Sequence, residues 1–172
     1  TEDDIAEFAS WGVNSLRIPI NGNRFFRKVG QETQFDPSGF IPLDQIISWC
    51  EKYGIYVIID MHAAPGGQNQ RNHADSDGVA RLWTDPETYQ PRLVSLWKAI
   101  ADRYCTNKTV GGYELLNEPM LGSESEREPE KNHQLRKLYE ECTRAIRSVD
   151  KNHIIVIEGS FWAQDYTGLF PA

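Results

Sequence analysis

A carboxylate beside an amide, in the tripeptide Asn117-Glu118-Pro119, is the part of the sequence best suited to do chemistry. The apolar residues before it predict a strand, and Pro119 has no N–H to give to a sheet. We therefore expect the strand to end with Glu118 as its last side chain. A carboxylic acid on a rigid strand end, next to an amide donor, suits a general acid facing a substrate. An ordinary glutamate before a loop has the same local sequence, so the motif alone leaves both interpretations open.

Polar residues lie at the ends of all four predicted strands. Four strands carry them at or near the carboxyl end: Arg17, His62, Asn117 with Glu118, and Glu158. In parallel α/β folds these ends meet at one edge, which is the functional edge of the sheet. We therefore expect these side chains to share one site.

The two-residue alternation of strands separates this polar set into layers. Asp60 and His62 point to one face of their strand, and Glu114 and Glu118 share a face of theirs. If that face lines a barrel, Asp60 and Glu114 lie one layer deeper and need a cation. Arg17 is the nearest candidate, so we expect both acids to be structural supports.

The elements that position these residues alternate along the chain. We predict helices at 1–11, 43–53, 85–104 and 131–149, strands at 13–20, 55–62, 113–118 and 153–158, and a polar loop at 21–40. Pro91 is expected to restart the third helix as a first-turn residue. The strand at 55–62 is apolar on both faces, as in a parallel sheet covered by helices. Two α/β architectures fit this pattern, an open doubly wound sheet or part of a (β/α)8 barrel.

Composition narrows the class of function. The 172 residues carry a net charge of -7, which argues against a nucleic acid or a membrane surface as partner. The segment 64–68 lacks the glycine spacing of a phosphate-binding turn, so a nucleotide-binding sheet is disfavoured. Three widely spaced cysteines predict no disulfide framework. No apolar run reaches the roughly 20 residues of a membrane span. The sequence begins at Thr1 without a signal-like segment, and we expect it to have been trimmed.

Three motifs together resemble glycoside hydrolase family 5. They are Leu16-Arg17-Ile18-Pro19, the run Asp60-Met61-His62-Ala63-Ala64-Pro65-Gly66-Gly67-Gln68-Asn69, and Leu116-Asn117-Glu118-Pro119. The resemblance implies a (β/α)8 barrel that hydrolyses β-linked glucans or related polysaccharides with retention. It implies that Glu118 is the general acid/base and that Asn117 binds the sugar 2-hydroxyl. It places Arg17 and His62 in the polar ring around the −1 sugar. The loop after His62 is most similar to the branch with exo-acting and β-1,3-type glucanases.

The resemblance also implies that part of the family's site is missing. The family's nucleophile is a Glu on strand seven, whereas these residues correspond to strands two to five. We therefore expect residues 1–172 to be a partial catalytic domain, about half a barrel. Glu158 is a poor substitute, since retaining chemistry tolerates little error in carboxylate placement, and we expect it to orient a loop or pair with a cation. Open outer strands favour self-association or pairing with the missing half.

The remaining candidates are aromatic and histidine residues. Trp162 could stack on a sugar ring or cap the core. His73 could line the cleft, although a solvated loop histidine is the simpler interpretation. His133 and His153 are expected at the surface and at a strand start, and we expect neither a metal nor another cofactor.

Two interpretations of the whole chain remain open. The leading one is a β-glycan hydrolase, secreted because polymeric glycans lie outside cells. The alternative is an inactive half-barrel that binds carbohydrate or assembles with a partner.

Overall fold

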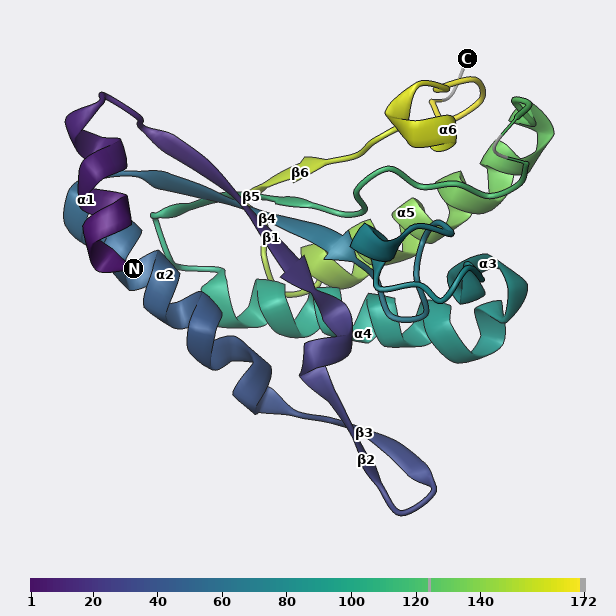
Figure 1. The fold of residues 1–172 in the computed structure, drawn as a ribbon, viewed down its shortest axis with the longest axis horizontal. Helices are drawn as coiled ribbons and strands as arrows, with labels where there is room; N and C mark the ends of the chain where they lie inside the picture. The colour runs from purple at the N-terminus through teal and green to yellow at the C-terminus, as the bar shows by residue number, and fades with distance from the viewer. Residues whose placement is uncertain (124, 171–172) are drawn as a thin grey trace.

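A four-stranded parallel sheet forms the centre of the computed structural model, which describes residues 1–123 and 125–170 (Figure 1). The strands lie in the order β1-β4-β5-β6: Ser15–Asn21, Tyr56–Ala63, Val110–Glu114 and Ile154–Val156. All three pairings in this sheet are parallel. Each strand therefore lies beside the next main-sheet strand in the sequence.

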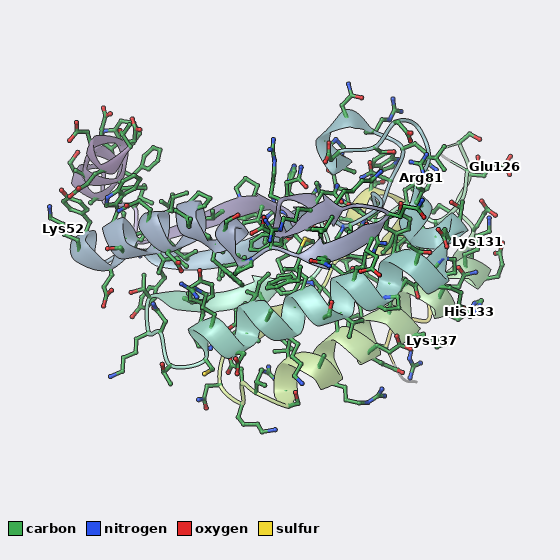
Figure 2. All side chains as sticks on the ribbon, turned by 90° about the horizontal axis from the view of Figure 1, so that it is seen from below. Lys52, Arg81, Glu126, Lys131, His133 and Lys137 are labelled. Atoms are coloured by element: carbon green, nitrogen blue, oxygen red, sulfur yellow. The ribbon has the colours of Figure 1, made fainter. Side chains whose placement is uncertain are left out.

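This strand order decides between the two predicted architectures. A doubly wound sheet reverses its strand order and carries helices on both faces. Here the order never reverses, and the three long helices lie along the same side of the sheet (Figures 1 and 2). They are α2, α4 and α5, at Phe40–Tyr53, Pro86–Tyr104 and Asn132–Arg147. This is the arrangement of a segment of a (β/α)8 barrel, the one of the two architectures that the family resemblance implied.

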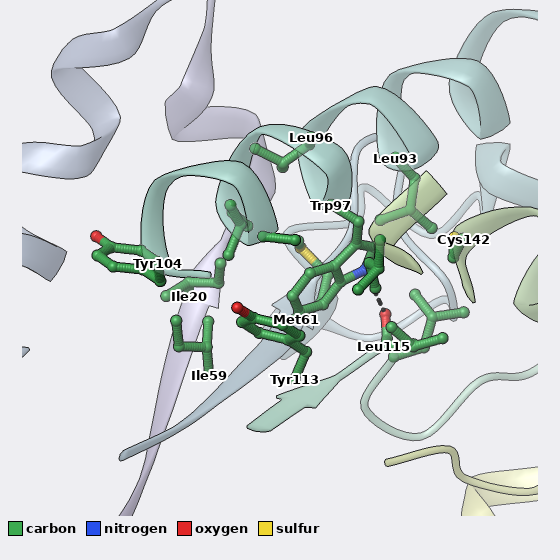
Figure 3. Packing of buried hydrophobic residues seen from close by; sticks show 14 of the residues in the cluster. Ile20, Ile59, Met61, Leu93, Leu96, Trp97, Tyr104, Tyr113, Leu115 and Cys142 are labelled. Carbon is green, nitrogen blue, oxygen red and sulfur yellow. Dashed lines mark hydrogen bonds between the residues drawn. The ribbon is translucent and has the colours of Figure 1, made fainter. Parts of the chain in front are cut away.

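The hydrophobic core lies between the sheet and these helices. Val57, Ile59 and Met61 of β4 point toward the helices and are fully buried. Trp97 of α4 is also buried, and its indole N–H donates to the Leu115 carbonyl at 3.2 Å (Figure 3). Alternation then turns the intervening β4 side chains to the opposite face, where the site lies.

That opposite face corrects one expectation. The apolar run of β4 predicted burial on both faces, but Ile58 and His62 are only half-buried, and no described helix covers them. The polar side of the sheet is therefore open across the described residues.

Local sequence explains where the first helix begins and where the second ends. Thr1 caps α1 (Glu2–Ser10), and the side chain of Asp4 completes the capping box. Gly54 ends α2 with φ +69°, a backbone conformation that favours glycine. Shorter turns complete the chain: α3 at Arg81–Thr84, α6 at Ser160–Ala163, and 3-10 turns at Gly22–Phe25, Pro37–Gly39, Asn72–Ala74 and Pro129–Lys131.

The prediction of a plain loop at 21–40 was wrong. The segment contains the hairpin of β2 (Phe26–Val29) and β3 (Glu32–Phe35), which projects from the body of the chain (Figure 1). Phe26 lies opposite Phe35 with ring centroids 5.9 Å apart, and this cross-strand aromatic pair stabilises the hairpin.

Pro91 also behaves differently from the prediction. It lies inside α4, which begins at Pro86, so it does not restart the helix. The lost backbone hydrogen bond is tolerated because Leu93, Leu96 and Trp97 continue the buried stripe of the helix. None of the described helices has the length and hydropathy needed to cross a membrane.

Candidate active site

Arg17 is the centre of the polar cluster on the open face of the sheet. Its Nε and Nη2 donate to the two carboxylate oxygens of Glu114, at 2.7 and 2.8 Å. Its Nη1 lies 3.0 Å from Oδ2 of Asp60, whose side chain is fully buried. The expectation that Arg17 neutralises both deeper acids is confirmed.

The position of Arg17 differs in one respect from the prediction. It is the third residue of β1 and lies opposite Ile58, whereas Asp60 lies opposite Pro19 nearer the carboxyl edge. The long side chain spans this offset and reaches the edge. There Nη2 also donates to Oδ1 of Asn117, at 2.8 Å.

Glu118 does not end a strand as predicted, because β5 stops at Glu114. The backbone after it still pairs with its neighbours: Leu115 N–H donates to the Val156 carbonyl and Asn117 N–H to that of Met61. Glu118 itself adopts φ +46°, a left-handed conformation that costs free energy for a residue with a side chain. Strained residues of this kind persist where the surrounding contacts hold them.

Glu158 holds this corner in place. Its Oε2 accepts the Glu118 N–H at 2.6 Å, and its Oε1 lies 3.6 Å from Nη2 of Arg17. β6 ends at Val156, so Glu158 follows the strand by two residues, which corrects the predicted strand end. We predicted that Glu158 orients a loop or pairs with a cation, and its contacts with the Glu118 N–H and with Arg17 confirm this.

The protonation of Glu158 depends on its neighbours. Burial and a hydrogen bond with Glu114 raise the pKa of Glu158 to about 7. Glu114 has its pKa lowered in spite of its burial, because Arg17 hydrogen-bonds the ionised form. Burial also raises the pKa of Asp60. Glu158 therefore titrates near neutral pH.

This pKa predicts how stability depends on pH. Because the folded pKa of Glu158 lies above its ordinary 4.5, the stabilisation is complete below pH 4.5 and is lost as the pH rises through 7. At full burial the difference would correspond to about 3.4 kcal/mol, and solvent screening at this half-buried carboxyl group reduces it to about 2–3 kcal/mol. Glu158→Gln keeps a neutral side chain of the same shape. Urea unfolding measures the free energy of unfolding, and between pH 4.5 and 8 we expect it to decline less in Glu158→Gln than in the unaltered protein. The same pH dependence in both proteins would contradict a raised pKa of Glu158.

A wide cavity of about 770 Å³ opens beside the Glu118 carboxyl group. Its lining residues come from the loop after β4, from the Asn-Glu-Pro corner and from α6: Gln70, Arg71, Asn72, His73, Glu118 and Trp162. The Glu118 side chain is 43% exposed, and its Oε2 lies 3.3 Å from Nε2 of His73. Ring centroids lie 5.7 Å apart between His62 and His73 and 6.3 Å apart between His73 and Trp162. The predicted site residues Arg17, His62, His73, Asn117, Glu118 and Trp162 therefore form one connected group.

His62 belongs to this group through Asp60. Its Nδ1 lies 2.8 Å from Oδ2 of Asp60, on the same strand face as the alternation predicted. The imidazole is 32% exposed. A buried carboxylate on one ring nitrogen fixes the ring orientation and leaves Nε2 for other partners.

Sequence reasoning gave no role to Gln68, which joins the loop to the corner. Its buried side chain accepts from Ala64 N–H at 2.9 Å and donates to the carbonyls of His62 and Asn117, each at 2.8 Å. The amide side chains of Gln68 and Asn69, directly after the Gly66-Gly67 turn, were the sequence feature that could have indicated this role, since buried amides are rarely left without partners. The side chain fixes the loop relative to the Asn-Glu-Pro corner.

Trp162 reaches the cavity from a left-handed turn. Phe161, Trp162 and Ala163 all have positive φ, at 51°, 59° and 62°. The turn is anchored by Ser160, whose hydroxyl donates to Asn132 and whose N–H donates to the Asp165 carbonyl at 2.9 Å. Three consecutive left-handed residues are costly, and strain of this kind concentrates at functional sites. The geometry thus places Trp162 in the cavity wall.

The other histidines and the cysteines lie outside the site. His133 is exposed at the start of α5, as predicted (Figure 2). His153 directly precedes β6, at the strand start as predicted, and its side chain is largely buried, since its ring bonds the Asp150 carboxylate and the Asn107 carbonyl. The three cysteines are free. Within residues 1–123 and 125–170 no cluster of potential metal ligands occurs.

Comparison with known proteins identifies the family. The family model described as Cellulase (glycosyl hydrolase family 5) matches residues 1–170. A Beta-xylosidase of Phanerodontia chrysosporium is 34% identical over 168 residues, which cover 97% of this chain and 33% of that protein. A Sporulation-specific glucan 1,3-beta-glucosidase of Saccharomyces cerevisiae is 36% identical, over 96% of this chain and 36% of that protein.

Solved structures agree with the sequence comparison. The crystal structure of endoglucanase Cel5A from Thermotoga maritima superposes with a TM-score of 0.73 and 28% identity. The match covers 100% of this chain and 48% of that one, so the chain spans less than half the length of these relatives. This chain belongs to glycoside hydrolase family 5, and its sheet is part of a (β/α)8 barrel.

Proposed function

We propose that these residues form the acid/base half of the active site of a retaining β-glycan hydrolase, with Glu118 as the general acid/base. The observation that supports this best is the environment of the Glu118 carboxyl group, which faces a wide cavity. Asp60, Glu114 and Glu158 are instead held around the guanidinium group of Arg17. Glu118 is therefore the acid of this edge that is placed to meet a substrate.

The chemistry requires a second carboxylate. In the first step Glu118 gives its proton to the glycosidic oxygen while a nucleophile attacks the anomeric carbon and forms a glycosyl-enzyme. In the second step the Glu118 carboxylate takes a proton from the water that releases the sugar. The nucleophile lies about 5–5.5 Å from the acid in such enzymes. We assign it to the other half of the barrel, outside these 172 residues.

Asn117 is the proposed partner of the sugar 2-hydroxyl group. Arg17 fixes its amide orientation by donating to Oδ1. The Nδ2 atom is buried and has no hydrogen-bond partner among the described residues. A buried donor without a partner is costly, so a substrate hydroxyl that satisfies it would bind favourably. Arg17 and His62 position this group, and Trp162 and His73 are proposed to contact the sugar on the cavity side.

The proposed substrate is a β-glucan or a related oligo- or polysaccharide. Family membership and the names of the relatives support this class, and the open cavity has room for a sugar. Because polymeric glycans lie outside cells, the enzyme is proposed to be secreted.

The rest of the barrel is the proposed partner of the outer strands. β1 and β6 each pair with one neighbour in the described sheet. Ile154 on β6 is 63% exposed, which is unusual for an isoleucine in a barrel strand. Further sequence or a second polypeptide would cover this edge; we call the resulting assembly the complete enzyme.

The stereochemistry of the product tests the proposal. We expect the complete enzyme to hydrolyse a β-glucan oligosaccharide and to release the β-anomer first, as followed by proton NMR during the first turnovers. Initial release of the α-anomer would contradict a retaining mechanism. Sugar binding without turnover would instead support the alternative, an inactive protein that binds carbohydrate.

A further inference from the structure

The backbone of Glu118 is held on both sides by side chains from other segments. Its N–H donates to Oε2 of Glu158 at 2.6 Å, and its carbonyl accepts from Nδ2 of Asn69 at 3.0 Å. Glu158 follows β6, and Asn69 lies in the loop after β4. We call these two side chains the backbone clamp. Among the described residues that line the cavity neither of them occurs, so the clamp is placed to act through Glu118.

The orientation of the Asn69 amide follows from a second hydrogen bond. Its Oδ1 accepts the Arg71 N–H at 2.9 Å, which leaves Nδ2 facing the Glu118 carbonyl. A flipped amide would lose both bonds. Asn69 is also fully buried, so close packing restricts its movement.

Glu158 is anchored by contacts of its own. Tyr139 of α5 donates its hydroxyl to the Glu158 carbonyl at 2.9 Å, and Oε1 of Glu158 lies 3.6 Å from Nη2 of Arg17. Tyr139 is itself buried in the hydrophobic core. Both members of the clamp are therefore fixed to the fold by groups other than Glu118.

The conformation that the clamp holds is an unfavourable one for Glu118. Its φ of +46° lies in the left-handed region, where the Cβ atom is crowded by the backbone. The φ and ψ angles of Glu118 set the rotation of its two peptide groups relative to each other, so holding both groups fixes the conformation. Without the clamp the backbone can relax to the commoner right-handed or extended regions. That change rotates the Cα–Cβ bond and redirects the carboxyl group.

We propose that Asn69 and Glu158 are positioning residues that hold the Glu118 carboxyl group at the glycosidic oxygen by clamping its backbone in the left-handed conformation. The proposal rests on the role of Glu118 as general acid/base. Proton transfer needs the carboxyl group within hydrogen-bond reach of that oxygen. An enzyme without the clamp keeps its nucleophile and its sugar-binding groups but presents the acid in the wrong place.

The test compares kcat/KM on two substrates in the complete enzyme. A β-glucan oligosaccharide needs a proton on its leaving oxygen, whereas a dinitrophenyl β-glycoside does not. We expect Glu158→Ala and Asn69→Ala each to lower the oligosaccharide value by about 10–100-fold, because a misplacement of about 1 Å can cost 10²-fold. The dinitrophenyl value should fall much less. Glu158→Gln keeps a carbonyl oxygen for the Glu118 N–H, so it should lose less than Glu158→Ala.

The double variant Asn69→Ala/Glu158→Ala separates a clamp from two independent residues. Both members hold one conformation, so once one is removed the other has little left to hold. We expect the double variant to lose about as much oligosaccharide activity as the more impaired single variant, whereas independent effects would multiply. Urea unfolding shows which variants are folded. If Glu158→Ala does not fold, Asn69→Ala alone still gives the comparison between the two substrates.

The outcomes separate this proposal from the proposed function on which it rests. The clamp is overturned by an equal loss on both substrates, by losses that multiply in the double variant, or by a single variant that keeps its oligosaccharide activity. A Glu158→Gln variant as impaired as Glu158→Ala overturns it as well. In each case Glu118 remains the acid if Glu118→Gln loses activity on the oligosaccharide. If Glu118→Gln keeps that activity, the proposed function itself fails.

Discussion

Glu118→Gln is expected to lower kcat/KM for a β-glucan oligosaccharide by about 10²–10⁴-fold in the complete enzyme. The amide has the shape of the carboxyl group but cannot give a proton to the leaving oxygen. A dinitrophenyl β-glycoside needs no such proton, because its leaving group departs as a stable anion. For that substrate kcat/KM, which reports the first step, should stay close to the unaltered value.

A loss of kcat/KM on the oligosaccharide but not on the dinitrophenyl glycoside would support Glu118 as the general acid. Glu51→Gln changes an exposed glutamate on α2 and serves as the matched control, with both rates unchanged. An equal loss of Glu118→Gln activity on both substrates would show a general disturbance of the site, which contradicts the assigned role. Initial rates at several substrate concentrations are sufficient for this comparison.

Arg17→Leu is expected to destabilise this chain by about 2–4 kcal/mol. The variant leaves the carboxylates of Asp60, Glu114 and Glu158 without their shared cation. Removing one partner of a fully buried ion pair costs 3–5 kcal/mol, roughly, and partial exposure of the Arg17 side chain reduces that figure. Domains of this size are stable by only about 5–15 kcal/mol, so the effect is large. Urea unfolding at pH 7.5 measures it.

The pH dependence of the stability loss in Arg17→Leu tests whether the unpaired carboxylates cause that loss. At pH 4 the acids are closer to neutral and need the cation less, so the loss should shrink. Arg136→Ala removes a surface ion pair with Glu140 on α5 and should cost about 0.5 kcal/mol or less. A loss for Arg17→Leu no greater than that of Arg136→Ala would show that the cluster does not depend on Arg17.

The position of the polar site could be predicted from strand periodicity. Alternation along 55–62 and 113–118 placed Asp60 and Glu114 below the edge and pointed to Arg17 as their cation. Those residues are close in space because neighbouring parallel strands align them, as in the pairing of Asp60 with Glu114. The two-residue period is a property of local sequence, so this part of the fold could be predicted.

The path of the chain after each strand could not be predicted from the sequence in this way. The left-handed conformation of Glu118 depends on Glu158, which is 40 residues away in the sequence. The places of Gln68 and Asn69 depend on carbonyl groups of other segments. Such side-chain to backbone hydrogen bonds leave no periodic pattern. The hairpin at 26–35 was missed for a similar reason, since its aromatic pair stabilises strands too short to show clear alternation.

The most direct measurement of the central claim uses Glu118→Ala of the complete enzyme with a dinitrophenyl β-glycoside and sodium azide. Without the Glu118 carboxylate as general base, water hydrolyses the glycosyl-enzyme slowly. Azide is already an anion, so it can attack the glycosyl-enzyme without losing a proton. We predict that azide accelerates turnover and that NMR identifies the product as the β-glycosyl azide. An α-glycosyl azide would mean that Glu118 is the nucleophile, and no acceleration would mean that it is not the acid/base.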